Sequence, residues 1–113
     1  MKRIDAYIKR QRLGDVVAAL HEIAGLTGVS LFDMHGFGRT RGRNEPVHIV
    51  DNAVRWVPHV KLEVVCRDEL VEQVIAAVQS GARTGLRADG KVYVLPVEDA
   101  LRISTGERGE AAV

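Results

Sequence analysis

Residues 60–66 read VKLEVVC, and apolar side chains stand at every second position from Val60 to Cys66. A period of two is typical of a strand with one buried face. The next segment carries apolar residues at helical spacing on one face, and these are Val71, Val74, Ile75 and Val78. Asp68 is a good N-cap for that helix, which we expect to end at Gly81 or Gly85. A strand followed by an amphipathic helix is therefore predicted.

Two β-α-β units can be traced along the chain. In the first unit, residues 4–8 and residues 29–35 alternate like strands. Residues 13–23 lie between them, with helical spacing that ends near Gly25. In the second unit, a further strand is expected at residues 91–95. Two such units in one short chain predict an α+β fold, the ferredoxin-like βαββαβ sandwich, in which four antiparallel strands are backed by two helices.

Length and composition narrow the class of protein. A chain of 113 residues indicates a single domain, residues 1–113. The formal net charge of +1 argues against a nucleic-acid-binding protein. Cys66 is the single cysteine, so no internal disulfide is expected and a reducing compartment fits. No stretch approaches the ~20 apolar residues that span a bilayer, and no signal peptide is recognised. We therefore expect a cytoplasmic protein.

A long connection, from about residue 38 to residue 57, separates the two units. Most connections have about 4–6 residues, and longer ones tend to be binding loops or disordered. The stretch Gly36-Phe37-Gly38-Arg39 opens it. Glycines let backbone N–H groups approach an anion, and Arg39 adds a permanent charge, with Arg41 and Arg43 close behind. The stretch predicts a phosphate cradle at the root of a mobile loop; a solvated turn is the alternative.

Four blocks of sequence, residues 36–39, 60–65, 89–94 and 105–110, resemble the PII signal-transduction proteins in content, order and separation. The resemblance covers nearly the whole chain, with one extra residue near residues 24–25. It implies a compact homotrimer whose sheets face inward, with an adenine nucleotide (ATP, ADP or AMP) in each cleft between neighbouring subunits. Residues 100–103 are then expected to pair across a subunit boundary, and the tail from about residue 104 to be disordered or docked on a neighbour.

The resemblance also implies a set of nucleotide-binding residues. The glycines of the cradle, Arg39 and Lys91 would hold phosphates, together with Arg102 of the adjacent subunit. Glu63 and Val65 would contact adenine and ribose, and residues 28–30 would approach the base from the neighbour. The full set is Gly28, Val29, Ser30, Gly36, Gly38, Arg39, Thr40, Glu63, Val65, Thr84, Asp89, Gly90, Lys91 and Arg102. The alternative for residues 89–91 is a hairpin-type turn followed by an exposed lysine.

The chain departs from the family pattern near the terminal phosphate. Thr40 replaces a glutamine that helps to hold Mg²⁺ and 2-oxoglutarate, and His59 replaces a lysine that pairs with the acid. Leu86, Ala88 and Ser104 stand where the family has a lysine, a glycine and an arginine. These changes predict weak or absent binding of 2-oxoglutarate and weak discrimination for Mg·ATP. ADP or AMP is then a candidate physiological ligand, and the role of Mg²⁺ stays open.

The long loop is expected to bind a target protein. Its apolar centre and two of its arginines form the expected contact surface, namely Arg41, Arg43, Pro46, Val47, His48, Ile49 and Val50. The alternative is that these side chains fold back onto the base of the loop. Asn52 stands where many bacterial relatives have a uridylylated tyrosine, so nucleotide occupancy is the expected switch. A membrane transporter or a metabolic enzyme is a candidate target, and the former would bring the protein to a membrane.

No catalytic or metal-binding residues are predicted. No nucleophile has a nearby base, and the histidines and Cys66 lack a recognisable metal spacing. The leading hypothesis is a nucleotide-sensing regulator that is not an enzyme. Two alternatives stay open at this point: a trimeric divalent-cation-binding protein of similar architecture, and a small phosphate-transfer enzyme.

Overall fold

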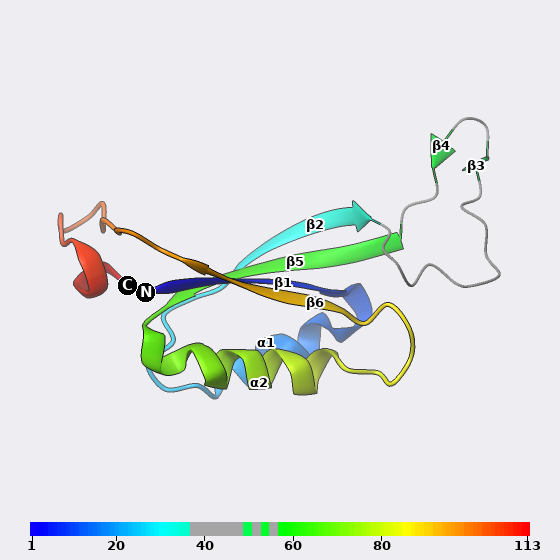
Figure 1. The fold of residues 1–113 in the computed structure, drawn as a ribbon, viewed down its shortest axis with the longest axis horizontal. Helices are drawn as coiled ribbons and strands as arrows, with labels where there is room; N and C mark the ends of the chain where they lie inside the picture. Colours follow the sequence, from blue (N-terminus) through cyan, green and yellow to red (C-terminus); the bar gives the residue numbers. More distant parts are fainter. Residues whose placement is uncertain (37–48, 51–52, 55–56) are drawn as a thin grey trace.

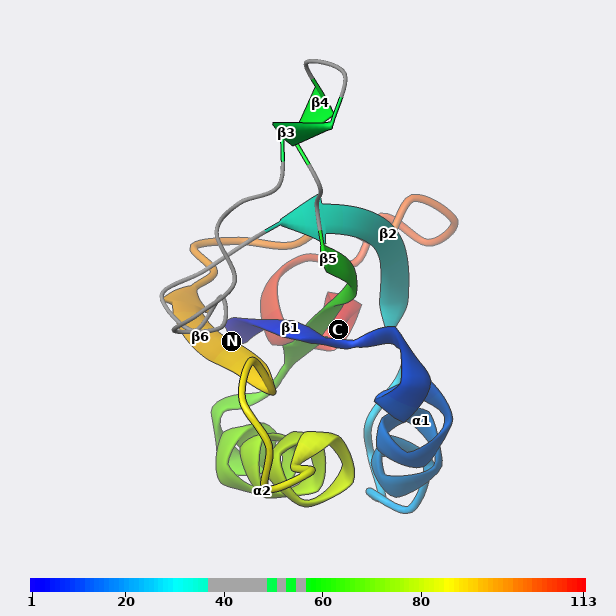
Figure 2. The ribbon, with the colours of Figure 1, turned by 90° about the vertical axis from the view of Figure 1, so that its right-hand side faces the viewer.

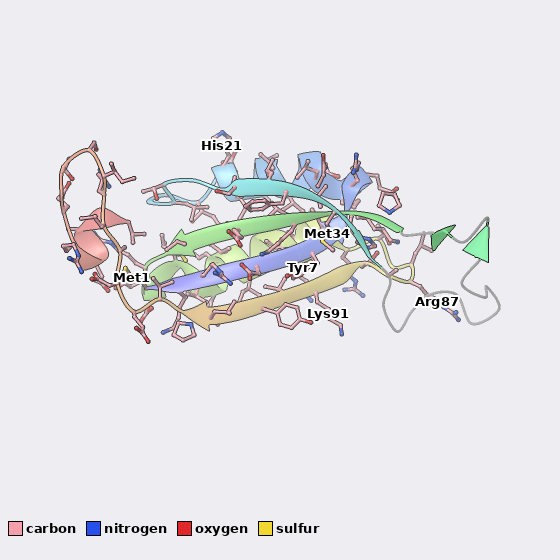
Figure 3. The ribbon with its side chains drawn as sticks, turned by 90° about the horizontal axis from the view of Figure 1, so that it is seen from above. Met1, Tyr7, His21, Met34, Arg87 and Lys91 are labelled. Atoms are coloured by element: carbon pink, nitrogen blue, oxygen red, sulfur yellow. The ribbon has the colours of Figure 1, made fainter. Side chains whose placement is uncertain are left out.

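The computed structural model describes residues 1–36, 49–50, 53–54 and 57–113. One sheet holds four antiparallel strands in the spatial order β2-β5-β1-β6 (Figure 1). Their bounds are β1 Lys2–Lys9, β2 Ser30–Gly36, β5 Val57–Cys66 and β6 Gly90–Pro96. Helices α1 (Leu13–His21) and α2 (Val71–Ala82) lie side by side against one face (Figure 2), and Figure 3 looks onto the other. The predicted α+β class, four-stranded antiparallel sheet and two helices are confirmed.

Short elements complete the described parts of the chain. Three 3₁₀ turns are present, η1 Arg10–Arg12, η2 Asp68–Leu70 and η3 Gly109–Ala112. Two strands of two residues each, β3 (Ile49–Val50) and β4 (Ala53–Val54), pair with one another. This small ladder lies within the long connection between the two β-α-β units. In the described segments, no helix has both the length and the apolar character needed to cross a membrane.

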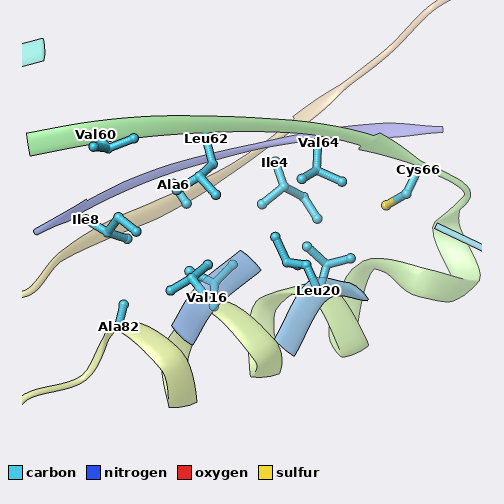
Figure 4. Packing of buried hydrophobic residues seen from close by; sticks show 12 residues of the cluster. Ile4, Ala6, Ile8, Val16, Leu20, Val60, Leu62, Val64, Cys66 and Ala82 are labelled. Atoms are coloured by element: carbon cyan, nitrogen blue, oxygen red, sulfur yellow. The ribbon is translucent and has the colours of Figure 1, made fainter. Parts of the chain in front are cut away.

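The core lies between the sheet and the two helices (Figure 4). Alternate residues of β1 and β5 point to this side because strand side chains alternate between faces. The helices meet them with residues at helical spacing. The buried apolar set is Ile4, Ala6, Ile8, Val16, Leu20, Val60, Leu62, Val64, Cys66, Val74, Val78 and Ala82. Burying one aliphatic side chain of this size contributes about 1.5–3 kcal/mol, so this face accounts for most of the stability of the fold.

Gly81 has a different role from the one the sequence suggests. It lies inside α2, one residue before the helix ends, and so does not terminate it. A Cβ at this position would come within 2.9 Å of the Val16 Cα. The two helices therefore approach closely at Gly81, and a larger residue would push α1 away.

Two other boundaries differ from the expectations. Helix α1 ends at His21, four residues before Gly25. Strand β5 begins at Val57 and contains Pro58, which pairs with His35 of β2. Proline is tolerated there because β1 pairs with β5 only as far as His59, so Pro58 has a strand on one side only.

The prediction that Asp68 caps the second helix is wrong. Arg67 is the N-cap of η2, and no side chain makes a capping hydrogen bond there. The Asp68 carboxylate instead accepts a hydrogen bond of 2.9 Å from the Met1 ammonium group and lies 3.7 Å from the Lys2 Nζ. These cations lower its pKa. The carboxylate thus ties the start of β1 to the turn before α2.

The C-terminal segment, residues 97–113, folds on itself beside the N-terminus (Figure 1). Leu101 pairs with Arg108 of the same chain, and the Gly109 N–H donates to the Ala100 carbonyl at 2.9 Å. The Arg108 guanidinium also contacts the Asp99 carboxylate. Disorder was one expectation for this tail, and the compact turn corrects it. The Ile103 side chain is 95% exposed and is therefore accessible for contact with another surface.

Candidate functional site

The face of the sheet away from the helices carries a row of aromatic and cationic side chains. Phe32, Lys61, Tyr7 and Lys91 are directly opposite one another across β2, β5, β1 and β6. The Lys61 Nζ lies 5.7 Å from the centre of the Phe32 ring and 5.9 Å from that of Tyr7. Both distances are within cation–π range. We name this side the open face, because no helix covers it.

The next row of the open face holds charges that compensate one another. Asp5 is only 5% exposed although it lies on this side. Its carboxylate is within 3.0 Å of the Arg3 Nε and 3.9 Å of the Lys61 Nζ. Lys61 donates a 2.7 Å hydrogen bond to Glu63, which raises the pKa of Lys61 and lowers that of Glu63. Two cations and two anions therefore form one neutral cluster at the centre of this face.

Large apolar groups surround that cluster and stay accessible. The Tyr7 and Tyr93 rings meet edge to face with centroids 5.9 Å apart. Phe32 and Tyr93 are each about half exposed. Exposed aromatic groups gathered around a compensated charge cluster are typical of a protein–protein contact surface.

Gly90 fixes the start of β6. Its φ is +118°, and a Cβ here would overlap the Tyr7 carbonyl oxygen. Only glycine allows the chain to come this close to β1. Lys91 follows and pairs with Tyr7 on the open face (Figure 3). Within the described parts of the chain, Lys91 makes no hydrogen bond or ion pair, so its charge is available to an anion.

Asp89 stabilises the loop between α2 and β6. It bonds to a second residue of that loop and to the end of β1. Its carboxylate accepts hydrogen bonds from both the Thr84 N–H (2.9 Å) and the Thr84 hydroxyl. The Lys9 Nζ lies 3.2 Å from the same carboxylate. The hydrogen bonds from Thr84, with help from Lys9, lower the pKa of Asp89 to about 2. Asp89 is thus ionised at neutral pH.

The predicted nucleotide-binding residues fall into two groups. The first lies where β1 ends and β6 begins, and consists of Thr84, Asp89, Gly90 and Lys91, with Gly36 at the end of β2. Residues 89–91 do not form a hairpin turn, because this stretch follows a helix and not a strand, but Lys91 is an exposed strand residue, as that alternative has it. Gly36 and Lys91 therefore share one end of the molecule (Figure 1).

The second group lies elsewhere on the chain. Glu63 and Val65 are on the open face of β5, and Ser30 is paired with Glu63 across the sheet, directly after Gly28 and Val29. Arg102 is in the C-terminal segment, beyond the opposite end of β6 (Figure 1). A single chain therefore does not bring the two groups together.

Several predicted residues lie outside the described segments. They are Gly38, Arg39, Thr40, Arg41, Arg43, Pro46, Val47 and His48. Ile49 and Val50 form β3. The functional calls on all of these residues remain predictions.

Lys9 is the residue that the sequence did not reveal. It ends β1 as one more polar position in an alternating strand. Its significance depends on the strand order, because β1 is next to β6 and so next to Asp89. Lys9 could have been recognised as a partner of Asp89 only if the strand order had been known.

The described residues contain no group of three His, Cys, Asp or Glu side chains placed to hold a metal ion. Burial raises the pKa of the Cys66 thiol. A thiol of this kind is a poor nucleophile and a poor metal ligand. This part of the structure offers no support for the metal-binding alternative.

Comparison with known proteins agrees with this geometry. The family described as "Nitrogen regulatory protein P-II" matches residues 1–107. Proteins of that name from Azospirillum brasilense and Rhodospirillum rubrum are 45% and 46% identical over 113 residues, which is the whole of this chain and of each relative. A crystal structure of Arabidopsis thaliana PII bound to citrate has a TM-score of 0.81 and 38% identity, and the match covers 99% of this chain and 91% of that one. This chain therefore belongs to the P-II family of nitrogen regulatory proteins, which are signalling regulators and not enzymes.

Proposed function

We propose that this chain is a nucleotide-sensing regulator. Three copies assemble through their open faces, bind an adenine nucleotide (ADP, ATP or AMP) in each cleft between neighbours, and control a target protein through the long loop, about residues 38–57. The observation that carries this proposal is the end of the sheet where Gly90 packs against β1 and is followed by Lys91, which has no ion-pair partner among the described residues. An exposed lysine next to a loop held close to the backbone suits a phosphate group.

The division of the predicted site into two groups supports a cleft between copies. Lys91 and Gly36 belong to one end of a chain, whereas Arg102 follows the other end of β6. A neighbour could supply Arg102 and residues 28–30 to the first group. A ligand held in this way would report on the assembly as well as on its own concentration.

The open face supports the association of copies with one another. Its charge cluster is neutral within each chain, so two such faces can meet without net repulsion. Its exposed aromatic groups gain from burial. A second copy fits this surface better than a highly charged partner does, because the surface has no excess charge to offer.

We propose that the ligand carries fewer phosphate groups than ATP does. Leu86 is 73% exposed on the loop after α2 and offers no charge to a terminal phosphate. The A. thaliana relative holds citrate, which is consistent with anion binding in this fold. We propose that ADP or AMP binds at least as well as Mg·ATP and that 2-oxoglutarate binds weakly or not at all.

The target is a protein that binds the long loop, about residues 38–57. A membrane transporter and an enzyme of nitrogen or carbon metabolism are the candidates. We propose a cytoplasmic protein that reaches a membrane only through such a transporter.

Calorimetric titration of the purified protein with ATP, ADP and AMP tests the proposal. Each titration is run with and without Mg²⁺ and 2-oxoglutarate, and sedimentation equilibrium gives the number of copies. The variant Lys91→Ala should lose at least tenfold in affinity, which corresponds to about 1.4 kcal/mol. Arg67→Ala removes an exposed cation outside the proposed site and should bind as the wild type does. A monomer, or a protein with no affinity for these nucleotides, would refute the proposal, and a divalent-cation titration then examines the metal alternative.

A further inference from the structure

The loop between α2 and β6, residues 83–89, can be followed in Figure 1. It is held by three side chains that we name the clamp: Lys9, Thr84 and Asp89. The Thr84 hydroxyl donates to one carboxylate oxygen of Asp89, and the Thr84 N–H donates to the other at 2.9 Å. The Lys9 Nζ lies 3.2 Å from the carboxylate and donates to the Thr84 hydroxyl at 3.4 Å. The clamp therefore closes the loop on itself and fastens it to the end of β1.

The two charged members of the clamp, Lys9 and Asp89, neutralise one another. The Lys9 and Asp89 side chains are only 16% and 25% exposed, and each is the other's counter-ion. Both oxygens of the carboxylate already accept hydrogen bonds. An anion that reaches this end of the sheet therefore meets the charge of Lys91, which is exposed and has no counter-ion among the described residues, and not that of Lys9.

The loop is held in a conformation that it would not adopt alone. Ala88 has a φ of +62° and is the one non-glycine residue with positive φ in the described parts of the chain. Such a conformation is unfavourable for a residue with a Cβ and persists only where the surroundings determine it. The clamp binds the next residue, Asp89, and the residue after that, Gly90, is pressed against Tyr7. Together these contacts hold Ala88 in its positive-φ conformation.

We propose that Asp89 and Lys9 are positioning residues of the nucleotide site. They do not contact the ligand; they hold residues 84–90 in the shape in which Gly90 and Lys91 receive a phosphate. This inference rests on the proposed function. It replaces the expectation that Asp89 itself binds the nucleotide, since a carboxylate next to a phosphate would repel it.

The direction in which one substitution changes the affinity for ADP separates a positioning role from direct contact. In Asp89→Asn a negative charge near the phosphates is lost, and electrostatics alone would raise the affinity for ADP. If Asp89 positions the loop, the affinity should fall instead, by about tenfold, because a hydrogen-bonded charge pair is broken. Asp33→Asn is the matched control: it removes an exposed carboxylate, 3.3 Å from Arg10 and 79% exposed, at no cost to the loop. Its affinity for ADP should stay within about twofold of the wild type.

A double-mutant cycle with Lys9→Met examines the role of the lysine. If Lys9 acts through Asp89, the substitution weakens ADP binding in the wild type but has little further effect in Asp89→Asn. If Lys9 contacts the phosphate, its loss costs the same factor in both backgrounds. Amide hydrogen exchange of the ligand-free variants gives a readout that does not need nucleotide: exchange at Thr84 should accelerate in Asp89→Asn and not in Asp33→Asn.

The outcomes are distinct. If the wild-type protein binds no adenine nucleotide, the proposed function fails. If the wild type binds but Asp89→Asn binds equally or more tightly, the positioning role is overturned while the proposed function stands. If Asp89→Asn does not fold, the exchange rate at Thr84 in Lys9→Met decides the question, and an unchanged rate there overturns the role of Lys9.

Discussion

The covered face and the open face of the sheet are made by the same strands, yet only the first is complete within one chain. On the covered face, alternate residues of β1 and β5 meet α1 and α2 and exclude water. On the open face, Asp5 is buried by its own neighbours while Phe32 and Tyr93 stay half exposed. The difference teaches that the same strands bury one face within the chain and leave large apolar groups accessible on the other.

The largest effect is expected on the covered face. Leu62 is buried in the core, and Leu62→Ala should lower the free energy of unfolding by ~2–5 kcal/mol, because a cavity replaces the lost contacts. Leu31 is paired with Leu62 across the sheet but is half exposed, so Leu31→Ala is a chemically identical control. It should cost less than ~1 kcal/mol. Urea unfolding at one protein concentration measures both, and equal losses would show that the two positions do not differ as described.

A second substitution separates assembly from folding. Tyr93→Glu places a charge among the aromatic groups of the open face. It should weaken self-association by ~2–4 kcal/mol, the size of effect at the centre of an interface, and leave the far-UV circular dichroism unchanged. Tyr93→Phe keeps the ring and serves as the control. Sedimentation equilibrium compares them, and a Tyr93→Glu protein that associates like the wild type would show that the open face is not the contact surface.

The end of the open face is its most constrained part, and Gly90→Ala tests this. A Cβ at φ +118° overlaps the Tyr7 carbonyl, so β6 must shift. We expect a loss of ~1–3 kcal/mol in the free energy of unfolding together with weaker nucleotide binding. Gly14→Ala is the control, since a Cβ there meets nothing within 4 Å. Thermal unfolding and calorimetry report the two effects, and a Gly90→Ala protein as stable as the wild type would contradict the close approach.

The smallest effect is expected on the pH dependence of the free energy of unfolding. The pKa of Asp89 is about 2 in the folded protein and 3.8 for an isolated side chain, so its ionisation stabilises the fold above pH 3.8. That contribution is lost as the pH falls towards 2. Because a quarter of the side chain is exposed to solvent, we expect only ~1 kcal/mol. The difference in unfolding free energy between wild type and Asp89→Asn should be largest near pH 6 and shrink below pH 4. A difference that does not change with pH would mean that the carboxylate contributes no charge-dependent stability.

Much of the fold could be predicted because its pattern is local. The alternation in residues 4–8 and 60–66 and the helical spacing in 71–78 specify which side chains point to the core. The boundaries were less accurate where the sequence offers competing signals. Pro58 resembles a strand breaker but is tolerated at a position with a neighbour on one side only.

The site was predicted in part. Lys91 and Gly90 were identified from a resemblance, and the structure gives a physical reason for the glycine. Lys9 was missed, and Asp68 was assigned to a helix cap although it binds the N-terminal ammonium group. In each case the partner lies far along the chain, beyond the reach of a periodic pattern.

The sequence alone determined the order of strands and helices, the side of each that is apolar and the family to which the chain belongs, because these depend on neighbouring residues and on blocks in a fixed order. Only the tertiary structure decided that Lys9 meets Asp89 and that the two helices approach closely at Gly81. It also decided that the predicted nucleotide-binding residues divide between one end of the sheet, its open face and the C-terminal segment. These contacts follow from the strand order β2-β5-β1-β6. That order is set by how whole elements pack against one another, which no short stretch of residues encodes.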